Sequence, residues 1–222
     1  MRHQARVAAM TVGALVLAAC GAENDSEPAS QTTASAEAVL VKADPVSSQD
    51  ITCSHPVRPN DTAAKLHERF GAQARAETLY GPEGIELAAM VLWPDDPARR
   101  VEVILAEDAM RSVSLVSVSQ NSDWRVAGLA VGDPLARVNE ANGKPVGLWG
   151  FGWDYGGYVT DLNGGELASL PDGCRLMMRV GPPEHAELAD GLVGEVELTS
   201  DDPRLAAADV RIEELTLRLD PE

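Results

Sequence analysis

The chain has 222 residues, of which 35 are Asp or Glu and 18 are Lys or Arg, so its formal net charge is −17. Nucleic-acid binding depends on neutralising phosphates with Lys and Arg, so this charge argues against DNA, RNA and anionic membrane surfaces as partners. Apolar residues make up 45% of the chain, which argues against a wholly disordered protein. The length suits one medium domain or two small ones.

Residues 1–19 have the organisation of an export signal. Arg2 and Arg6 precede the uncharged apolar stretch Val7–Ala19. This stretch is too short to span a bilayer but has the length of a signal-peptide core. It ends in Leu17-Ala18-Ala19-Cys20-Gly21, which resembles the lipobox of bacterial lipoproteins.

The lipobox resemblance implies cleavage before Cys20, diacylglycerol on its thiol and an acyl chain such as palmitate on the new amino terminus. An ordinary secretory signal cleaved near Ala19 is the alternative. The resemblance places the protein in the bacterial cell envelope, and the absence of Asp after Cys20 favours the outer membrane, facing the periplasm. Cleavage would remove Arg2 and Arg6 and no acidic residue, which changes the net charge from −17 to −19.

Residues 20–49 are expected to form a flexible tether between the lipid and a globular domain at 50–222. The segment is rich in Ala, Ser, Thr and acidic residues and contains no aromatic residue, so it cannot offset its ordering entropy by burial. A flexible coil of this length spans roughly 30 Å. With Cys20 assigned to lipid, Cys53 and Cys174 are an even pair in an oxidising compartment and predict a disulfide; two buried free thiols are the alternative.

Two segments, residues 61–71 and 133–143, begin alike and predict a tandem repeat. Each has the features of a short helix, with an Asp placed to accept free N–H groups at its start and a Gly suited to its left-handed end. A chance match between two capped helices is the alternative. The positions identical at an offset of 72 are Asp61/Asp133, Ala64/Ala136, Glu68/Glu140 and Gly71/Gly143.

Strand-like runs and turns follow each predicted helix, and Asn163-Gly164 is a strong hairpin signal. The layout indicates a β-rich α+β fold with two tandem units, at about 58–120 and 130–180, each a short helix plus an antiparallel β-meander, then C-terminal strands in about 192–219. The predicted strands are Ala76–Tyr80, Glu86–Trp93, Val101–Ala106 and Ser112–Ser119, then Val146–Tyr155, Tyr158–Leu162, Glu166–Leu170 and Cys174–Val180, and finally Val193–Leu198 and Val210–Leu219.

A capped helix ending in Phe-Gly or Asn-Gly before a β-meander is similar to the repeat of the SmpA/OmlA outer-membrane assembly lipoproteins. The β-lactamase-inhibitor-protein fold has two such units in tandem. The resemblance covers roughly residues 58 to 180. The stretch Gly150–Gly157 also resembles a segment of uncharacterised proteobacterial lipoproteins. These resemblances imply a role in envelope assembly or maintenance, and no catalytic residue is carried over from any of them.

Five of the nine aromatic residues lie between positions 149 and 158, and the first four alternate. In a strand, alternating residues share one face, with glycines and Asp154 on the other. Burial of this face in the core is the alternative interpretation, and it is favoured for Trp149 and Phe151. The candidate binding residues are Trp153, Asp154, Tyr155 and Tyr158.

No Gly-x-Ser-x-Gly elbow, His-Glu-x-x-His helix, phosphate loop or Cys-x-x-Cys pair occurs in the sequence. We therefore expect no enzymatic activity, no cofactor and no metal site. The primary hypothesis is a lipid-anchored envelope protein that binds a protein partner. One alternative is an inhibitor or scavenger of a cationic protein such as lysozyme, because a net charge of −19 would accelerate the encounter with a basic target. Another is a receptor for a small ligand or glycan.

Overall fold

The computed structural model describes residues 49–106 and 113–219. Cys20, the predicted export signal and the tether up to residue 48 lie outside the described residues. The described part is β-rich with few helices and several antiparallel strand pairings, which confirms the predicted α+β class.

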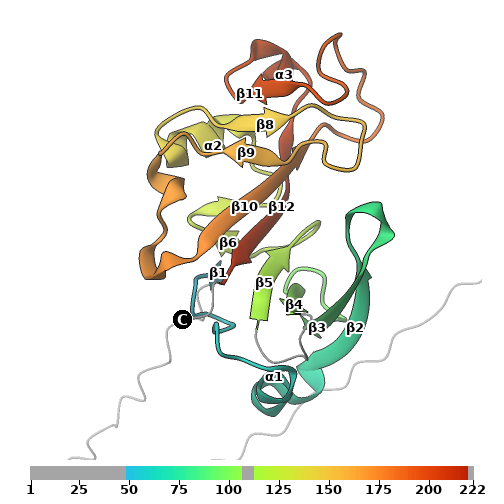
Figure 1. Cartoon of the computed structure of the whole chain (residues 1–222), viewed down its shortest axis with the longest axis vertical. Helices are drawn as coiled ribbons and strands as arrows, with labels where there is room; N and C mark the ends of the chain where they lie inside the picture. Colours follow the sequence, from blue (N-terminus) through green and yellow to red (C-terminus); the bar gives the residue numbers. More distant parts are fainter. Residues whose placement is uncertain (1–48, 107–112, 220–222) are drawn as a thin grey trace, which may run out of the picture. The chain divides into compact units, whose positions relative to one another are not determined.

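A six-stranded antiparallel sheet forms the largest element of the fold (Figure 1). Its first four strands are neighbours both in sequence and in space. The last two come from far along the chain. In spatial order the strands are β2 (Ala74–Tyr80), β3 (Glu86–Leu92), β4 (Val101–Leu105), β5 (Val113–Val118), β12 (Arg211–Arg218) and β10 (Arg175–Gly181).

Two smaller sheets and three short helices complete the regular structure of the described residues. One sheet has the order β11 (Glu197–Thr199), β8 (Gly147–Trp149), β9 (Val159–Asp161), and the other β1 (Asp50–Ile51), β6 (Arg125–Val126), β7 (Leu129–Ala130). The helices are α1 (Ala63–Phe70), α2 (Leu135–Asn142) and α3 (Pro203–Ala207), with 3-10 turns η1 (Gly71–Gln73), η2 (Pro82–Gly84), η3 (Glu166–Ala168) and η4 (Pro171–Gly173). None of the described helices is long and apolar enough to cross a membrane.

The large sheet has one buried face and one partly open face. On β4, Val101, Val103 and Leu105 belong to the core, whereas Glu102 and Ile104 between them are half-buried. Because side chains alternate along a strand, the cross-strand register assigns the side chains of β3, β5 and β12 to the same two faces. The open face is where the candidate site lies.

Asp61 and Asp133 make the same contact before the two predicted helices. The carboxylate of each accepts the backbone N–H of the residue three positions earlier, Arg58 or Ala130, at 2.9 Å. Both carboxylates thus close the turn that leads into the helix, and the expectation that they accept N–H groups of the helix itself was wrong. In α1 that role belongs to Thr62, whose Oγ1 accepts the N–H of Lys65 at 3.2 Å.

The segment after β9 corrects two predictions. The predicted strand Glu166–Leu170 is not formed, because Glu166–Ala168 is the 3-10 turn η3, and Asn163-Gly164 turns the chain into η3 rather than into a paired strand. The reason is the buried Asn142 side chain, which donates to the Leu162 carbonyl at 2.9 Å and accepts the Leu167 N–H at 3.2 Å. These contacts satisfy backbone groups that a strand would pair with a neighbour.

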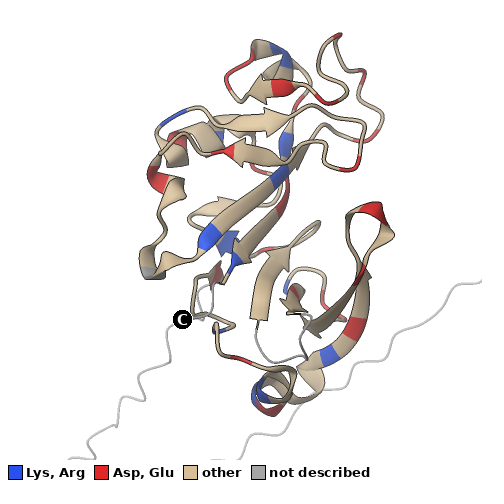
Figure 2. Cartoon of the chain, in the orientation of Figure 1, with Lys and Arg blue, Asp and Glu red and all other residues tan. Residues whose placement is uncertain are grey.

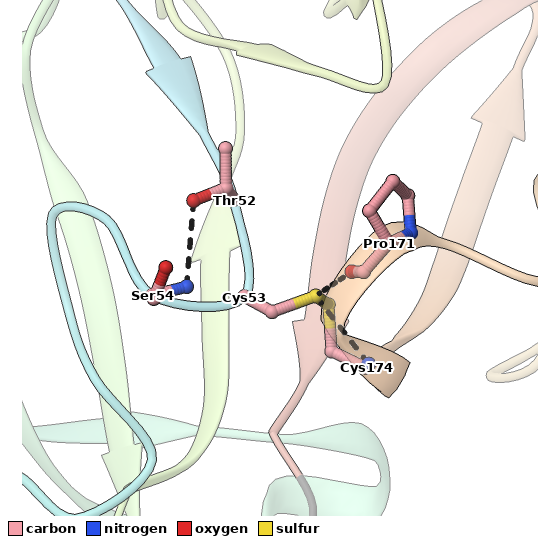
Figure 3. The surroundings of a disulfide bond; sticks show 5 residues. All are labelled: Thr52, Cys53, Ser54, Pro171 and Cys174. Atoms are coloured by element: carbon pink, nitrogen blue, oxygen red, sulfur yellow. Dashed lines mark hydrogen bonds between the residues drawn. A yellow bond between two sulfur atoms is a disulfide. The ribbon is translucent and has the colours of Figure 1, made fainter.

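Cys53 and Cys174 form the predicted disulfide, with their Cα atoms 5.5 Å apart (Figure 3). Both cysteines are buried, and the N–H of Cys174 lies 3.3 Å from Sγ of Cys53. The bond closes a loop with a sequence separation of 121 residues. In the chain-entropy model such a loop stabilises the fold by about 4 to 5 kcal/mol.

Candidate functional site

A groove of about 760 Å³ lies over the open face of the large sheet. Its floor comes from β4, β5, β12 and β10. One wall is the turn between β2 and β3, and the other is the segment after β8 (Figure 1). Three of the four candidate binding residues, Trp153, Asp154 and Tyr158, line this groove; the fourth, Tyr155, does not line it but is 42% exposed.

The aromatic segment is not the long alternating strand that the sequence predicted. Strand β8 ends at Trp149, and the chain then turns, with Gly152 at φ 85° and Gly157 at φ 76°. The Gly157 N–H returns to the Trp149 carbonyl at 3.1 Å, which closes the segment into a loop. Four glycines among the eight residues 150–157 make this backbone path accessible. The alternation predicts instead that three of them, Gly150, Gly152 and Gly156, share one face of a strand.

Gly157 is required by a close backbone approach as well as by its dihedral angle. Its carbonyl accepts the Val180 N–H at 2.9 Å, so the loop is held against β10. A Cβ at position 157 would lie 1.8 Å from the Val180 carbonyl oxygen, a distance that no side chain tolerates. The loop position is therefore fixed by the backbone of a strand that forms the groove floor.

The aromatic rings after β8 form a connected series. Phe151 is only 5% exposed and belongs to the core, as the core interpretation expected, whereas Trp149 is half-buried. Ring centroids lie 6.0 Å apart for Trp149 and Trp153, 5.4 Å for Trp153 and Tyr155, and 6.3 Å for Tyr155 and Tyr158. The first two pairs meet edge to face and the third is tilted. Edge-to-face contacts stabilise aromatic pairs, so the partly exposed rings form an ordered surface.

Arg179 on β10 joins the loop to the groove floor. Its Nε donates to the Gly156 carbonyl at 3.0 Å, and its guanidinium lies 5.3 Å from the centre of the Tyr158 ring. Partial burial, together with the nearby Glu214 carboxylate, raises the pKa of Tyr158, although Arg179 opposes that shift. The Tyr158 hydroxyl is therefore neutral at physiological pH and available for hydrogen bonding.

Below these groups the floor carries a hydrogen-bonded polar cluster of Ser117, Thr216 and Glu214. Oε1 of Glu214 accepts from Ser117 Oγ at 2.8 Å and from Thr216 Oγ1 at 2.9 Å, and Thr216 Oγ1 lies 2.9 Å from Ser117 Oγ. Ser117 and Thr216 are buried, at 4% and 6% exposure. The cluster presents a carboxylate with a fixed position to the groove.

A second charged group lies at the other side of the floor. Arg100 bridges Glu77 at 3.2 Å and Glu102 at 3.0 Å, and Arg75 holds Glu77 at 3.0 Å. Partial burial alone would raise the pKa of Glu77, but the hydrogen bonds from Arg75 and Arg100 outweigh it and lower the pKa. Counted together, the groove-lining charges are four carboxylates, Glu83, Glu102, Asp154 and Glu214, and one guanidinium, Arg179.

Sequence reasoning missed Arg179, Glu214, Ser117 and Thr216. In the predicted strands Cys174–Val180 and Val210–Leu219, the alternation assigns Arg179 and Glu214 to the face opposite their apolar neighbours. The sequence alone could therefore have indicated that both side chains lie outside the core. What it does not provide is the pairing of β12 with β5, which brings Ser117 and Glu214 together across 97 residues.

Among residues 49–106 and 113–219, no group of three or more His, Cys, Asp or Glu side chains is placed to hold a metal ion. The groove as it stands offers ordered aromatic rings, backbone-anchored loops and an excess of carboxylates, which is chemistry suited to binding. Comparisons with protein-family models, with curated proteins and with solved structures found no match to this chain.

Proposed function

We propose that this chain is a lipid-anchored, non-enzymatic protein of the bacterial envelope that binds a protein partner in envelope assembly or maintenance. The observation that carries the proposal is the groove between the β2–β3 turn and the aromatic loop of residues 149–158. Trp and Tyr are enriched in protein interfaces because one side chain supplies both a large apolar area and a polar group.

Support for the envelope location comes from the lipobox-like segment ending at Cys20 and from the Cys53–Cys174 disulfide. Disulfides persist in oxidising compartments such as the periplasm and are rare in the cytosol. Labelling of growing cells with radioactive palmitate tests the anchor. We expect label on the wild-type chain and none on a Cys20→Ser variant; label on both variants would contradict it.

A tandem arrangement of two helix-plus-meander units belongs to this proposal. It is supported by the shared sequence pattern and by the equivalent contacts of Asp61 and Asp133 with residues 58 and 130. In such an arrangement the first unit would supply the β2–β3 wall of the groove and the second unit the aromatic wall.

The excess of carboxylates around the groove favours one second candidate, an inhibitor or scavenger of a cationic protein. Long-range attraction of this kind weakens as salt screens the charges, whereas binding through aromatic rings is much less sensitive. Binding that falls steeply between low and physiological salt would favour the cationic partner. A purified glycan that competes for the aromatic loop would instead favour a glycan receptor.

Crosslinking in intact envelopes followed by affinity capture tests the binding proposal. The double variant Asp154→Asn/Tyr155→Ala alters two exposed side chains of the loop, and Asp201→Asn is a matched control in an exposed turn outside the groove. We expect a specific adduct with the wild type and the control, and loss of that adduct in the double variant with an unchanged melting transition. An adduct retained at full yield in the folded double variant would contradict the proposed site.

A further inference from the structure

The two edges of the six-stranded sheet are protected to different degrees. At the β10 edge, the aromatic loop covers the strand through the Gly157–Val180 hydrogen bond and a bridge between Tyr158 and Arg179, and the β10–β12 register shifts between Arg179 and Val180. Strand β2 forms the opposite, outer edge (Figure 1). It pairs with β3 in unbroken register from Ala74 to Tyr80 and contains no proline or bulge.

Two hydrogen bonds at the ends of the hairpin determine which β2 residues face outward. Gly81 donates to the Ile85 carbonyl at 2.8 Å, and Trp93 donates to the Gln73 carbonyl at 2.7 Å. Hydrogen-bonded and non-hydrogen-bonded pairs alternate in an antiparallel ladder, so the odd-numbered residues bond to β3. The backbone groups of Ala76, Thr78 and Tyr80 therefore point away from the sheet.

These outward groups have no partner in the described part of the chain. The N–H of Ala74 is taken by the Gly71 carbonyl, but no backbone hydrogen bond outside the ladder involves residues 76, 78 or 80. The outward backbone groups of these three alternate residues have the spacing with which an added antiparallel strand would pair. Such an unprotected edge is a template for strand addition, because main-chain hydrogen bonds supply affinity without requiring a particular sequence.

The side chains around this edge indicate what kind of strand fits. Ala76 and Thr78 are small and exposed, which leaves room for bulky residues on an added strand, and Tyr80 and Ile85 at its distal end are 72% and 55% exposed. Figure 2 shows acidic residues along the hairpin and at its tip. Glu83 and Glu86 form no ion pair with any described residue, whereas Glu77 is held by Arg75 and Arg100.

We propose that β2 is a strand-addition site for an extended, basic segment of a partner polypeptide. The segment would pair antiparallel with Ala76, Thr78 and Tyr80 and place lysine or arginine side chains near Glu83 and Glu86. The proposal deepens the proposed function and rests on it for the class of partner. A second copy of the chain is disfavoured as occupant because each copy carries a net charge of −17.

The direct test uses a seven-residue peptide of alternating lysine and valine, with an alternating glutamate and valine peptide as the control. Amide hydrogen exchange is followed by NMR at Ala76, Thr78 and Tyr80. We expect the basic peptide to slow exchange at these three amides by at least tenfold, and the acidic peptide to leave them unchanged. Binding of the basic peptide without protection of these amides would overturn the proposal.

Matched edge variants separate backbone pairing from side-chain contact. Thr78→Pro removes an outward N–H at an edge position where proline is tolerated, and Thr78→Ala keeps that N–H. We expect the proline variant to weaken basic-peptide binding at least tenfold and the alanine variant to change it less than threefold. Ala76→Pro is the second proline variant if the first does not fold. Equal affinity of a folded proline variant and wild type would overturn strand addition.

The same variants separate this proposal from the groove proposal. Loss of partner capture in Asp154→Asn/Tyr155→Ala, with capture unchanged in Thr78→Pro, would overturn strand addition and leave the groove as the binding site. Loss in Thr78→Pro but not in the loop variant would support strand addition and contradict the groove. A concentration-dependent dimer in sedimentation that Thr78→Pro abolishes would assign the edge to a second copy and overturn the basic partner.

Discussion

The two helix-containing halves of the described chain begin alike and then diverge. After α1, strands β2 to β5 follow one another as neighbours in a single sheet. After α2, β8 pairs with β9 and with β11 in a small sheet, whereas β10 and β12 belong to the large one. In the first half, ladder hydrogen bonds join strands that follow one another in the sequence, whereas in the second half β8 pairs with β11 and β10 pairs with β12 across intervening segments.

The aromatic wall of the candidate groove lies in the connection between β8 and β9. The backbone of residues 150–151 is anchored by hydrogen bonds at 2.8 Å to the segment before β11: Gly150 donates to the Val196 carbonyl, Phe151 donates to the Leu192 carbonyl, and the Phe151 carbonyl accepts from Gly194. Such a loop presents side chains such as Trp153 and Tyr155 to solvent. The regular ladder of β2 to β5 presents side chains only at its edge and on its open face. Binding surfaces commonly arise in this way, on loops positioned by a rigid scaffold.

The largest effect on stability is expected from removing the disulfide, which joins the two halves by linking the segment before α1 to the segment before β10. A Cys53→Ser/Cys174→Ser double variant should lose about 4 kcal/mol of unfolding free energy, because its unfolded chain is no longer constrained. Urea unfolding of oxidised wild type and the variant measures this. Equal midpoints and slopes would show that the bond contributes nothing to stability.

Glycine substitutions give the next largest effect and compare the loops directly. Gly157→Ala should cost about 3 kcal/mol or more, since its Cβ meets the Val180 carbonyl and its φ is 76°. Gly84→Ala, in the β2–β3 turn, has a similar φ of 73° but open space around it, so it should cost only about 1 kcal/mol. Thermal unfolding of both variants tests the contrast, which equal costs would contradict.

The smallest effect concerns the charged group on β2 and β4. Glu77→Gln should destabilise the fold by less than about 1 kcal/mol at neutral pH, because the pair is partly exposed. The pKa of Glu77 is lowered in the fold, so its contribution is present above the unfolded-state value of 4.5 and is lost as the pH falls through the folded-state pKa. Urea unfolding at several pH values should show the two proteins converging in acid. A difference that persists there would contradict this account.

Much of the first half could be predicted from the sequence, because its signals are local. Turns at 81–84 and 94–97 bound the predicted strands Glu86–Trp93 and Val101–Ala106, and the observed β3 and β4 lie within those ranges. The second half depends on contacts that no local pattern contains. Asn142 holds the turn at residues 162–167 through hydrogen bonds to residues 20 or more positions away. In the aromatic segment, glycines with positive φ bend the backbone into a loop, although the alternation of side chains there is typical of a strand.

The candidate site was predictable only in part for the same reason. The concentration of aromatic residues at 149–158 identified one wall of the groove. The opposite wall includes Tyr80 and Glu83, and the floor includes Arg179 and Glu214. These residues lie on four different strands or turns, and only the sheet order brings them to one groove.

Photocrosslinking from inside the groove tests whether the groove holds the partner. A photoreactive amino acid is placed in intact envelopes at Met177 or Ser119, which line the groove, and at Glu140 on α2, an exposed position outside it. We expect one protein adduct of the same mass from both groove positions and none from Glu140. No adduct from either groove position, or the same adduct from Glu140, would contradict the claim that this groove holds the partner.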